Sequence, residues 1–432
     1  MSRWVRRRRW LAALALVFCS LMVIPASVQA QVARIESAGR QLVLLFNQKV
    51  EPDQLFTPEF LARVPAAQLK DITRTVRDQL GAAIAAEIVG PHDPLGAALT
   101  LRFERGSAQL RIALDPTTPH LLRGLLVSGT QRMDDSLAAI AAEFGALPGQ
   151  ASFAAARLGT ASPEILVSHQ PALRLAIGSA FKLFILAELS RQISTGERGW
   201  SDVVPLSHKS LPSGFLQDWP RASPMTLHSL AALMISQSDN SASDTLLHLA
   251  GRERVEALLP RLGLGNDPRN RPFLSTLEAF ALKGGDTALT TRWLAADEDG
   301  KRRLLAELGR ADPARIDIAR LASKPNHIDQ VEWFASAQEL IGTMDWLRRE
   351  GGEQALDILA INPGLGRPAA APFAYLGYKG GSETGVLAMT FLVRDRKGGW
   401  HAVAGAWNDP AAPLAAARFE LLMSRAIALL GR

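Results

Sequence analysis

Runs of hydrophobic residues follow two spacings in the first third of the chain, and each spacing predicts a type of element. Apolar residues recur at helical spacing over residues 65–80 and predict a helix. Short apolar runs bounded by turn residues predict strands over 97–103, 108–114 and 121–127. Residues 31–129 are therefore predicted to form a small α+β domain.

The pattern changes from residue 130 onward, where longer helices are expected. Residues 179–191 are apolar nearly all round, which is typical of a buried helix. Ser241 and Asp244 have capping-box spacing and predict the start of another helix. Three antiparallel strands are expected over 372–379, 386–393 and 400–407, followed by a terminal helix over 414–430. Residues 130–432 thus predict an α/β (α+β) domain with an antiparallel sheet and flanking helices.

The first 30 residues have the composition of an export signal. Five arginines precede an apolar stretch over 11–23, and Val28-Gln29-Ala30 is a small-residue cleavage site. We expect cleavage after Ala30 and a periplasmic or secreted protein, whose contact with the membrane is through this signal. The arginine run also fits twin-arginine export. An uncleaved anchor is the alternative.

Removing this leader changes the charge and the cysteine chemistry. The formal net charge of +6 falls to +1, so the basic composition is no argument for a nucleic-acid partner. The single cysteine, Cys19, leaves with the leader, so the mature chain has no thiol nucleophile. No H-E-x-x-H, G-x-S-x-G or glycine-rich phosphate loop is present. We therefore expect neither a metal nor an organic cofactor.

Three short motifs carry the candidate chemistry. They are Ser179-Ala180-Phe181-Lys182, Ser238-Asp239-Asn240 and Lys379-Gly380-Gly381. S-x-x-K alone occurs about once in a chain of this length, whereas S-D-N is expected in fewer than about one chain in ten. A serine with a lysine one helical turn away is a nucleophile beside a base. The non-catalytic alternative is a helix-capping serine with a lysine that snorkels to the surface.

The order and spacing of these motifs resemble those of class A β-lactamases, which belong to the penicillin-recognising serine enzymes. Ser238 follows Ser179 by 59 residues, close to the spacing in that family, and the resemblance covers residues 131–432. It implies a class A β-lactamase-like fold with an inserted helical subdomain. It also implies a catalytic group and a substrate-binding group. The catalytic residues are Ser179, Lys182 and Ser238, and the substrate-binding residues are Asn240, Lys379, Gly381 and Ser382.

The resemblance assigns a role to most of these residues. Ser179 is the nucleophile, Lys182 its base, and Ser238 the relay that passes a proton to the leaving nitrogen. Asn240 contacts the acyl-amide carbonyl and Lys379 faces the substrate carboxylate. The backbone N–H groups of Ser179 and Ser382 would form the oxyanion hole.

Two features depart from the family. Gly380 stands where the family has Thr or Ser, whose hydroxyl helps to bind the substrate carboxylate. The E-x-x-x-N element that positions the deacylating water is absent between Leu262 and Trp333, where Glu278 is the nearest candidate. A surface-helix glutamate would explain Glu278 equally well. Both departures put efficient β-lactam hydrolysis in doubt.

The order of the domains adds a second resemblance. A helix followed by strands before a β-lactamase-like domain is similar to the NTF2-like, or steroid-isomerase-like, domain of a two-domain protein of the clavulanic-acid gene cluster. The leading interpretation is an exported serine acyl hydrolase that acts on a β-lactam or acyl ester, with peptidoglycan as a further candidate partner. The alternatives are an esterase, a D,D-peptidase-like penicillin-binding protein with slow deacylation, or a non-catalytic binder of cell-wall fragments or another ligand.

Overall fold

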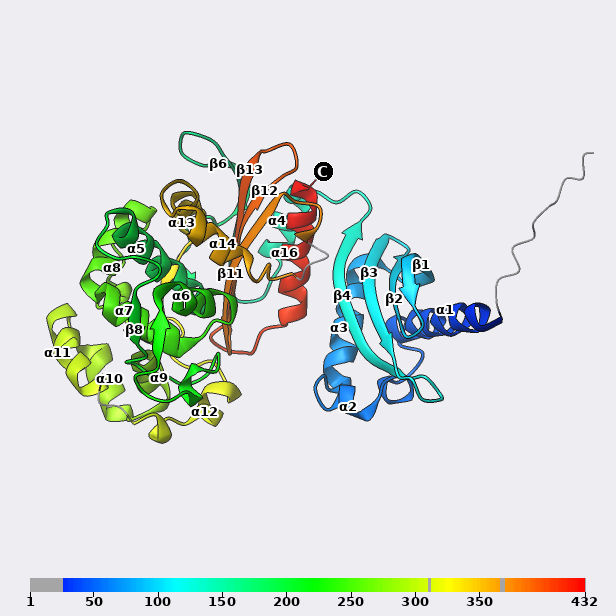
Figure 1. The fold of residues 1–432 in the computed structure, drawn as a ribbon, viewed down its shortest axis with the longest axis horizontal. Coiled ribbons are helices and arrows are strands. Elements are labelled where there is room, and N and C mark those ends of the chain that lie inside the picture. Colours follow the sequence, from blue (N-terminus) through cyan, green and yellow to red (C-terminus); the bar gives the residue numbers. More distant parts are fainter. Residues whose placement is uncertain (1–25, 310–311, 366–369, 432) are drawn as a thin grey trace, which may run out of the picture.

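The computed structural model describes residues 26–309, 312–365 and 370–431, and these form two α/β units (Figure 1). Most of the predicted leader, residues 1–25, lies outside the described residues. Residues 26–30 form the start of helix α1 (Ala26–Phe46). In the described ranges, no helix is long and apolar enough to cross a membrane.

The N-terminal unit is an antiparallel meander covered by helices. Its strands lie in the order β1 (Ala83–Asp93), β2 (Gly96–Phe103), β3 (Gly106–Leu114) and β4 (Leu122–Arg132). Inward and outward residues alternate along β2, so one face of the sheet is buried. Helices α1 and α3 (Ala66–Leu80) share a hydrophobic core with this face, and the short α2 (Pro58–Leu61) lies near β4.

These elements confirm the predicted helix and the three predicted strands of this unit. Helix α1 and strand β1 were not predicted. The helical signal for α1 is present in the sequence, since Ile35, Leu42 and Leu45 recur at helical spacing and are buried. The likeness to NTF2-like domains stays a prediction.

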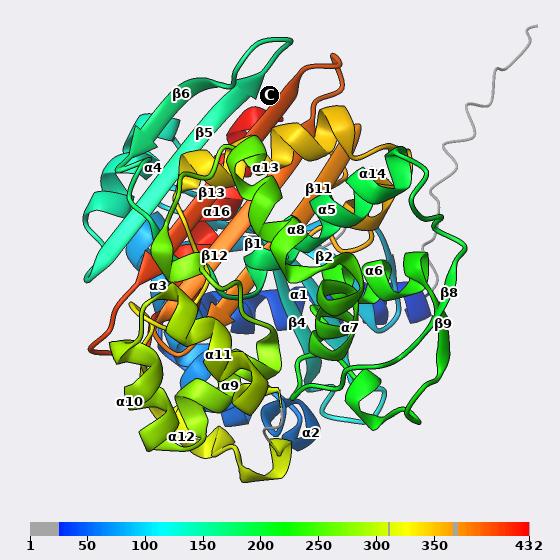
Figure 2. The same cartoon turned by 90° about the vertical axis from the view of Figure 1, so that its left-hand side faces the viewer.

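The C-terminal unit is built on a five-stranded antiparallel sheet with helices on both faces (Figure 2). The strand order is β11 (Tyr375–Glu383), β12 (Val386–Arg394), β13 (Trp400–Asn408), β5 (Gln150–Leu158) and β6 (Glu164–His169). Helices α4 (Leu137–Gly145) and α16 (Ala416–Leu430) share one core with the sheet. The larger helical layer covers the other face. The predicted mixed α/β fold is confirmed.

The helical layer holds most of the chain between β6 and β11. Its helices are α5 (Lys182–Ser194), α6 (Leu227–Ser236), α7 (Asn240–Ala250), α8 (Arg252–Leu258), α9 (Thr276–Gly284), α10 (Thr287–Ala295), α11 (Glu298–Leu308), α12 (Ile318–Ser323), α13 (Ala337–Glu350) and α14 (Glu353–Ala360). Two short strand pairs support it, β7 (Leu175–Ala176) with β10 (Phe334–Ala335) and β8 (Val203–Pro205) with β9 (Pro224–Thr226). Helices α9 to α12 gather at one end of this layer (Figures 1 and 2).

Helix α16 joins the two units. Leu421 belongs to the hydrophobic core of the N-terminal unit, although the rest of the helix packs mainly against the C-terminal sheet. One turn along, Arg425 has a fully buried side chain that binds Asp135 at 2.7 and 2.8 Å and Glu143 at 2.8 and 2.9 Å. The guanidinium also donates to Gln79 of α3 at 3.5 Å. The last helix of the chain therefore fixes both units.

Candidate active site

Ser179 lies in a 3-10 turn, η2 (Gly178–Phe181), between strand β7 and helix α5. The turn is held from one side, because Ile177 N donates to Trp333 O at 3.0 Å. The ring of Phe181 stacks on that of Trp333 at 3.7 Å between centroids. Ser179 itself is half-buried, whereas Gly178 and Ala180 on either side are buried. The turn thus presents one partly open hydroxyl on a rigid support.

Lys182 begins helix α5 directly after this turn, and its side chain is buried. Its Nζ donates to Ser238 O at 2.5 Å and to Asn240 Oδ1 at 2.7 Å, and it lies 3.1 Å from Ser238 Oγ. Burial lowers the pKa of Lys182 well below its ordinary value, and the charge of Lys379 lowers it further. This lowering favours the neutral amine, which is the form that a general base requires.

Ser238 lies between helices α6 and α7 with φ = 55°, in the left-handed region that a serine rarely adopts. Asp239 holds this backbone in place. One carboxylate oxygen accepts from Phe215 N at 2.8 Å and Leu216 N at 2.9 Å, and the other caps α7 by accepting from Ala242 N at 2.9 Å. The strained serine is thus fixed by its buried neighbour.

The capping box predicted at Ser241 and Asp244 is wrong. Helix α7 begins two residues earlier than a Ser241 cap would allow, and Asp239 is its N-cap. Asp244 instead points to helix α9, where it accepts from Thr276 N at 2.7 Å and Leu277 N at 3.0 Å. Spacing alone could not show whether Asp239 or Ser241 caps the helix, because both residue types are favoured at a helix N-cap.

Asn240 is buried at the start of α7, and both ends of its amide have partners. Its oxygen accepts from Lys182, and its nitrogen donates to Leu211 O at 3.0 Å. An amide nitrogen carries two hydrogens, so one remains for another acceptor. The geometry shows Asn240 as the group that orients Lys182, and its contact with a substrate stays a prediction.

Lys379 reaches the same place from strand β11. Its Nζ lies 3.1 Å from Ser238 Oγ and donates to Gly380 O at 2.5 Å. Burial lowers the pKa of Lys379 to about 7. The structure thus brings together Lys182, Ser238, Asn240 and Lys379, which come from three separate parts of the sequence.

Gly381 and Ser382 lie where β11 passes the nucleophile turn. A methyl group at Gly381 would lie 2.7 Å from Ala180 N and closer still to Ser179 N and Ile177 O. A methyl group at Gly178 would lie 3.0 Å from Ser382 N. Two glycines therefore let the two backbones approach, and this approach brings the predicted oxyanion donors, Ser179 N–H and Ser382 N–H, onto facing segments.

The structure gives a reason for the glycine at position 380. A methyl group there would lie 2.8 Å from Cζ of Tyr378 and would overlap the hydroxyl of that residue. Tyr378 and Gly380 are two residues apart on one strand, so they share a face of the sheet. Tyr378 thus occupies the space that a Thr or Ser side chain at position 380 would need.

Glu278, the candidate for the deacylating group, binds structural partners. It is buried in the first turn of α9, where it forms a capping box with Ser275. Its two oxygens bind Arg252 at 2.8 and 3.0 Å. The alternative of a surface-helix glutamate is therefore wrong, and the contacts indicate a buried structural role.

Sequence reasoning missed a second charged group near the nucleophile turn, formed by Lys283, Glu332 and Glu383. Lys283 binds the two glutamates over sequence separations of 49 and 100 residues, so no local motif could have revealed the group. In the described ranges, no cluster of three His, Cys, Asp or Glu side chains is placed to hold a metal ion.

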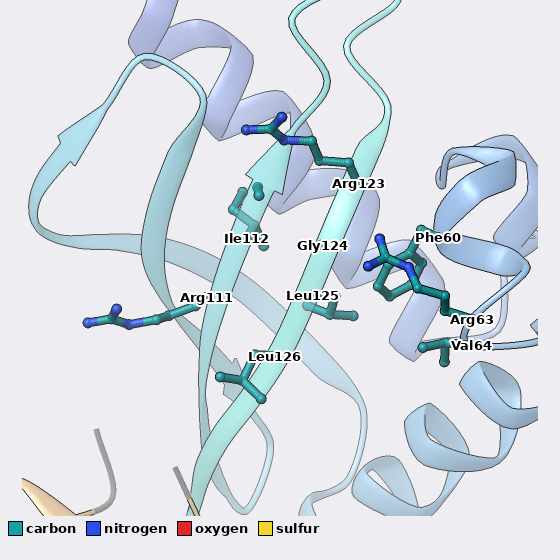
Figure 3. A pocket seen from close by; sticks show the side chains of 10 residues that line it. Phe60, Arg63, Val64, Arg111, Ile112, Arg123, Gly124, Leu125 and Leu126 are labelled. Atoms are coloured by element: carbon teal, nitrogen blue, oxygen red, sulfur yellow. The ribbon is translucent and has the colours of Figure 1, made fainter. Parts of the chain in front are cut away.

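A separate pocket of about 440 Å³ lies on the N-terminal unit (Figure 3). Strands β3 and β4 form its floor, and Phe60, Arg63 and Val64 form one side. Arg63 and Phe60 point toward β4, whereas Arg111 points away from it (Figure 3). None of the predicted catalytic or substrate-binding residues lines this pocket.

Comparisons with known proteins concern the C-terminal unit. Similar solved structures include a β-lactamase from Sphaerobacter thermophilus DSM 20745 (20% identity, TM-score 0.46, 68% of this chain and 95% of that chain). A β-lactamase from Chitinophaga pinensis DSM 2588 (15%, 0.44, 67% and 95%) and PBP-A (15%, 0.42, 67% and 95%) are also similar. No curated protein matches the chain. The family model described as the beta-lactamase enzyme family matches residues 133–298, the segment that carries Ser179, Lys182 and Ser238.

Proposed function

We propose that this chain is an exported serine acyl hydrolase that acts through an acyl-enzyme on Ser179, with β-lactams as its substrate class. The observation that carries the proposal is the convergence of Lys182 and Lys379 on Ser238 Oγ, because Lys182 follows the half-buried Ser179 by three residues. Such a site provides a nucleophile, a base and a proton relay. The match of residues 133–298 to the beta-lactamase enzyme family supports it.

The acylation step follows from these positions. Ser179 Oγ attacks the carbonyl carbon of the lactam while the neutral amine of Lys182 accepts its proton. The backbone N–H groups of Ser179 and Ser382 stabilise the oxyanion. The C–N bond then breaks, and Ser238, which lies 3.1 Å from both lysines, passes a proton to the leaving nitrogen. A charged Lys379 attracts the carboxylate of the substrate.

A second candidate function is an acyl hydrolase or D,D-peptidase-like enzyme whose natural substrate lies elsewhere, such as an acyl ester or a peptidoglycan fragment. The observation that favours it is Tyr378, which fills the space of the carboxylate-binding hydroxyl at position 380. Both candidates share the acylation step. They differ in the leaving group and in the rate at which water releases the acyl group.

One experiment tests the shared step and separates the two candidates. The mature protein is incubated with a penicillin, a cephalosporin and a small activated ester, and intact mass and substrate loss are followed together. Turnover of the β-lactams supports β-lactam hydrolysis, whereas lasting mass increase on Ser179 with turnover of the ester favours the second candidate. Equal turnover by wild type and Ser179→Ala would exclude the mechanism altogether.

A further inference from the structure

A buried group of three charges lies beside the nucleophile turn. Lys283 Nζ, from helix α9, lies 2.6 Å from Glu332 Oε1 and 2.6 Å from Glu383 Oε1. The side chains of Lys283 and Glu332 are 2% and 3% exposed, but that of Glu383 is 25% exposed. Of the two carboxylates, Glu383 is thus the one that reaches solvent.

Strand geometry places Glu383 on the catalytic side of β11. The pairing of β11 with β12 has no register irregularity from Tyr375 to Glu383. Alternate residues of a strand share a face, so Glu383 lies on the same face as Lys379 and Gly381. Lys379 contacts Ser238, and Gly381 packs against the turn of Ser179. Glu383 follows Gly381 by about 7 Å along the strand.

The second carboxylate, that of Glu332, reaches the nucleophile turn from the segment that pairs with Ile177. Glu332 precedes Trp333, whose carbonyl accepts from Ile177 N and whose ring stacks on Phe181. Lys283 closes the group from α9, so three separate elements meet at this point. These are also the charged groups that act on the Glu383 carboxyl.

We propose that the carboxylate of Glu383 is the general base that activates water for release of the acyl group from Ser179. This inference rests on the proposed function. Water attacks the carbonyl carbon of the acyl ester while one of its protons moves to Glu383. The bond between that carbon and Ser179 Oγ then breaks, the proton returns to Oγ through the site, and the product leaves as a carboxylic acid.

The rest of the site supports this assignment. The chain has no E-x-x-x-N element in the expected segment, and Glu278 is bound to Arg252 and its own helix. Burial and the nearby charge of Glu332 raise the pKa of Glu383 to about 8, with Lys283 opposing them. A carboxyl with this pKa is mostly protonated at neutral pH and becomes an active base as the pH rises to about 8 and above.

The first test follows the acyl-enzyme of wild type across pH. The protein is acylated with a penicillin, excess reagent is removed, and intact mass is followed between pH 6 and 9. We expect the deacylation rate to rise about tenfold per pH unit below pH 8 and to level above it, because only ionised Glu383 accepts the proton. A pH-independent rate, or an acyl-enzyme stable at every pH, would overturn the proposal.

The second test uses Glu383→Gln, which resembles the protonated acid and can still accept from Lys283. We expect acylation within about threefold of wild type and deacylation slower by about 10²–10⁴-fold, with no pH dependence left. Thermal unfolding checks the fold. A purely structural Glu383 would lower the melting temperature and leave the ratio of the two rates unchanged, which would refute the proposal.

Glu332→Gln is the matched control, because it makes the same change on the same lysine. Loss of the Glu332 charge removes one cause of the raised pKa of Glu383, so the deacylation profile should shift toward lower pH and keep its maximum. The outcomes also separate the two proposals. A wild type that neither forms an adduct on Ser179 nor turns over the β-lactam refutes the proposed function, whereas an adduct that Glu383→Gln releases at the wild-type rate refutes the role of Glu383 alone.

Discussion

Lys182 and Lys379 meet at one atom, since the Nζ of each lies 3.1 Å from the Oγ of Ser238. Both side chains are buried, and the charge of Lys379 contributes to the lowered pKa of Lys182. Two ammonium groups that are buried and within 3.1 Å of the same oxygen repel each other. The site therefore favours protonation states in which at most one of the two lysines is charged. This suits a division of roles, with Lys182 neutral as the base and Lys379 charged toward the substrate.

The first prediction concerns how substrate charge alters the pH dependence of acylation. The pKa of Lys379 is about 7, so its charge is present below pH 7 and is lost as the pH rises through that value. kcat/KM for a penicillin carboxylate should therefore fall above pH 7 relative to that for an uncharged activated ester. The ratio of the two cancels the common contribution of Lys182. Measuring it between pH 6 and 9 decides the matter, and a constant ratio would contradict the role of Lys379.

The second prediction concerns the close approach of Gly381 to Ser179. Gly381→Ala forces a methyl group against backbone atoms of Ile177, Ser179 and Ala180, so the nucleophile turn must move. A displacement of about 1 Å at a reacting group costs about 10²-fold in rate. We expect labelling of Ser179 by a fluorescent penicillin to slow by at least that factor. Gly159→Ala, where a methyl group meets open space, is the control and should label at the wild-type rate.

The third prediction separates Glu278 from deacylation. Glu278 and Arg252 form a pair whose side chains are 4% and 10% exposed, so Glu278→Gln leaves a buried guanidinium without its counter-charge. We expect a loss of about 3 kcal/mol in the free energy of unfolding, measured with denaturant, and an unchanged deacylation rate. Glu164→Gln, in an exposed pair with Arg157, should cost less than about 1 kcal/mol. Slow deacylation in Glu278→Gln would instead show that Glu278 takes part in deacylation.

Much of the C-terminal unit could be predicted because its signals are local. Turn residues mark the ends of β11, β12 and β13, and the helical spacing of Ser179 and Lys182 is short-range. Lys379 was placed near Ser238 only through the resemblance, since 141 residues separate them. The structure supplies the contact that the motif order implied.

The parts that sequence reasoning missed depend on distant packing. Glu383 is a candidate base because it contacts Lys283, which is 100 residues away in the sequence, and because it lies on the face of β11 that carries Lys379. Likewise, Gly380 is explained by the position of the Tyr378 ring, which depends on how β11 packs. The strand predicted over 372–379 ended four residues before the true end of β11 at Glu383, and the sequence did not show which face of that strand meets the nucleophile turn.

The last prediction concerns the joint between the two units. Arg425 is fully buried, Asp135 is 4% exposed, and the described residues show no other ion pair for that carboxylate. Glu143 keeps a second partner, because Arg132 lies 3.1 Å from it. Arg425→Met should therefore cost about 3–5 kcal/mol in the free energy of unfolding, mainly through the unpaired Asp135.

The loss should also appear as faster proteolysis between the units, because Arg425 contacts Gln79 of α3 as well as Asp135, which lies three residues after the end of β4. Arg418→Met is the control on the same helix, since the described part of the chain shows no ion pair for Arg418. Equal denaturation midpoints and equal cleavage rates in the two variants would show that the hydrophobic contact of Leu421 holds the units without the buried charges. A lower midpoint with unchanged labelling of Ser179 would instead show that the joint stabilises the chain and leaves the active site independent of it.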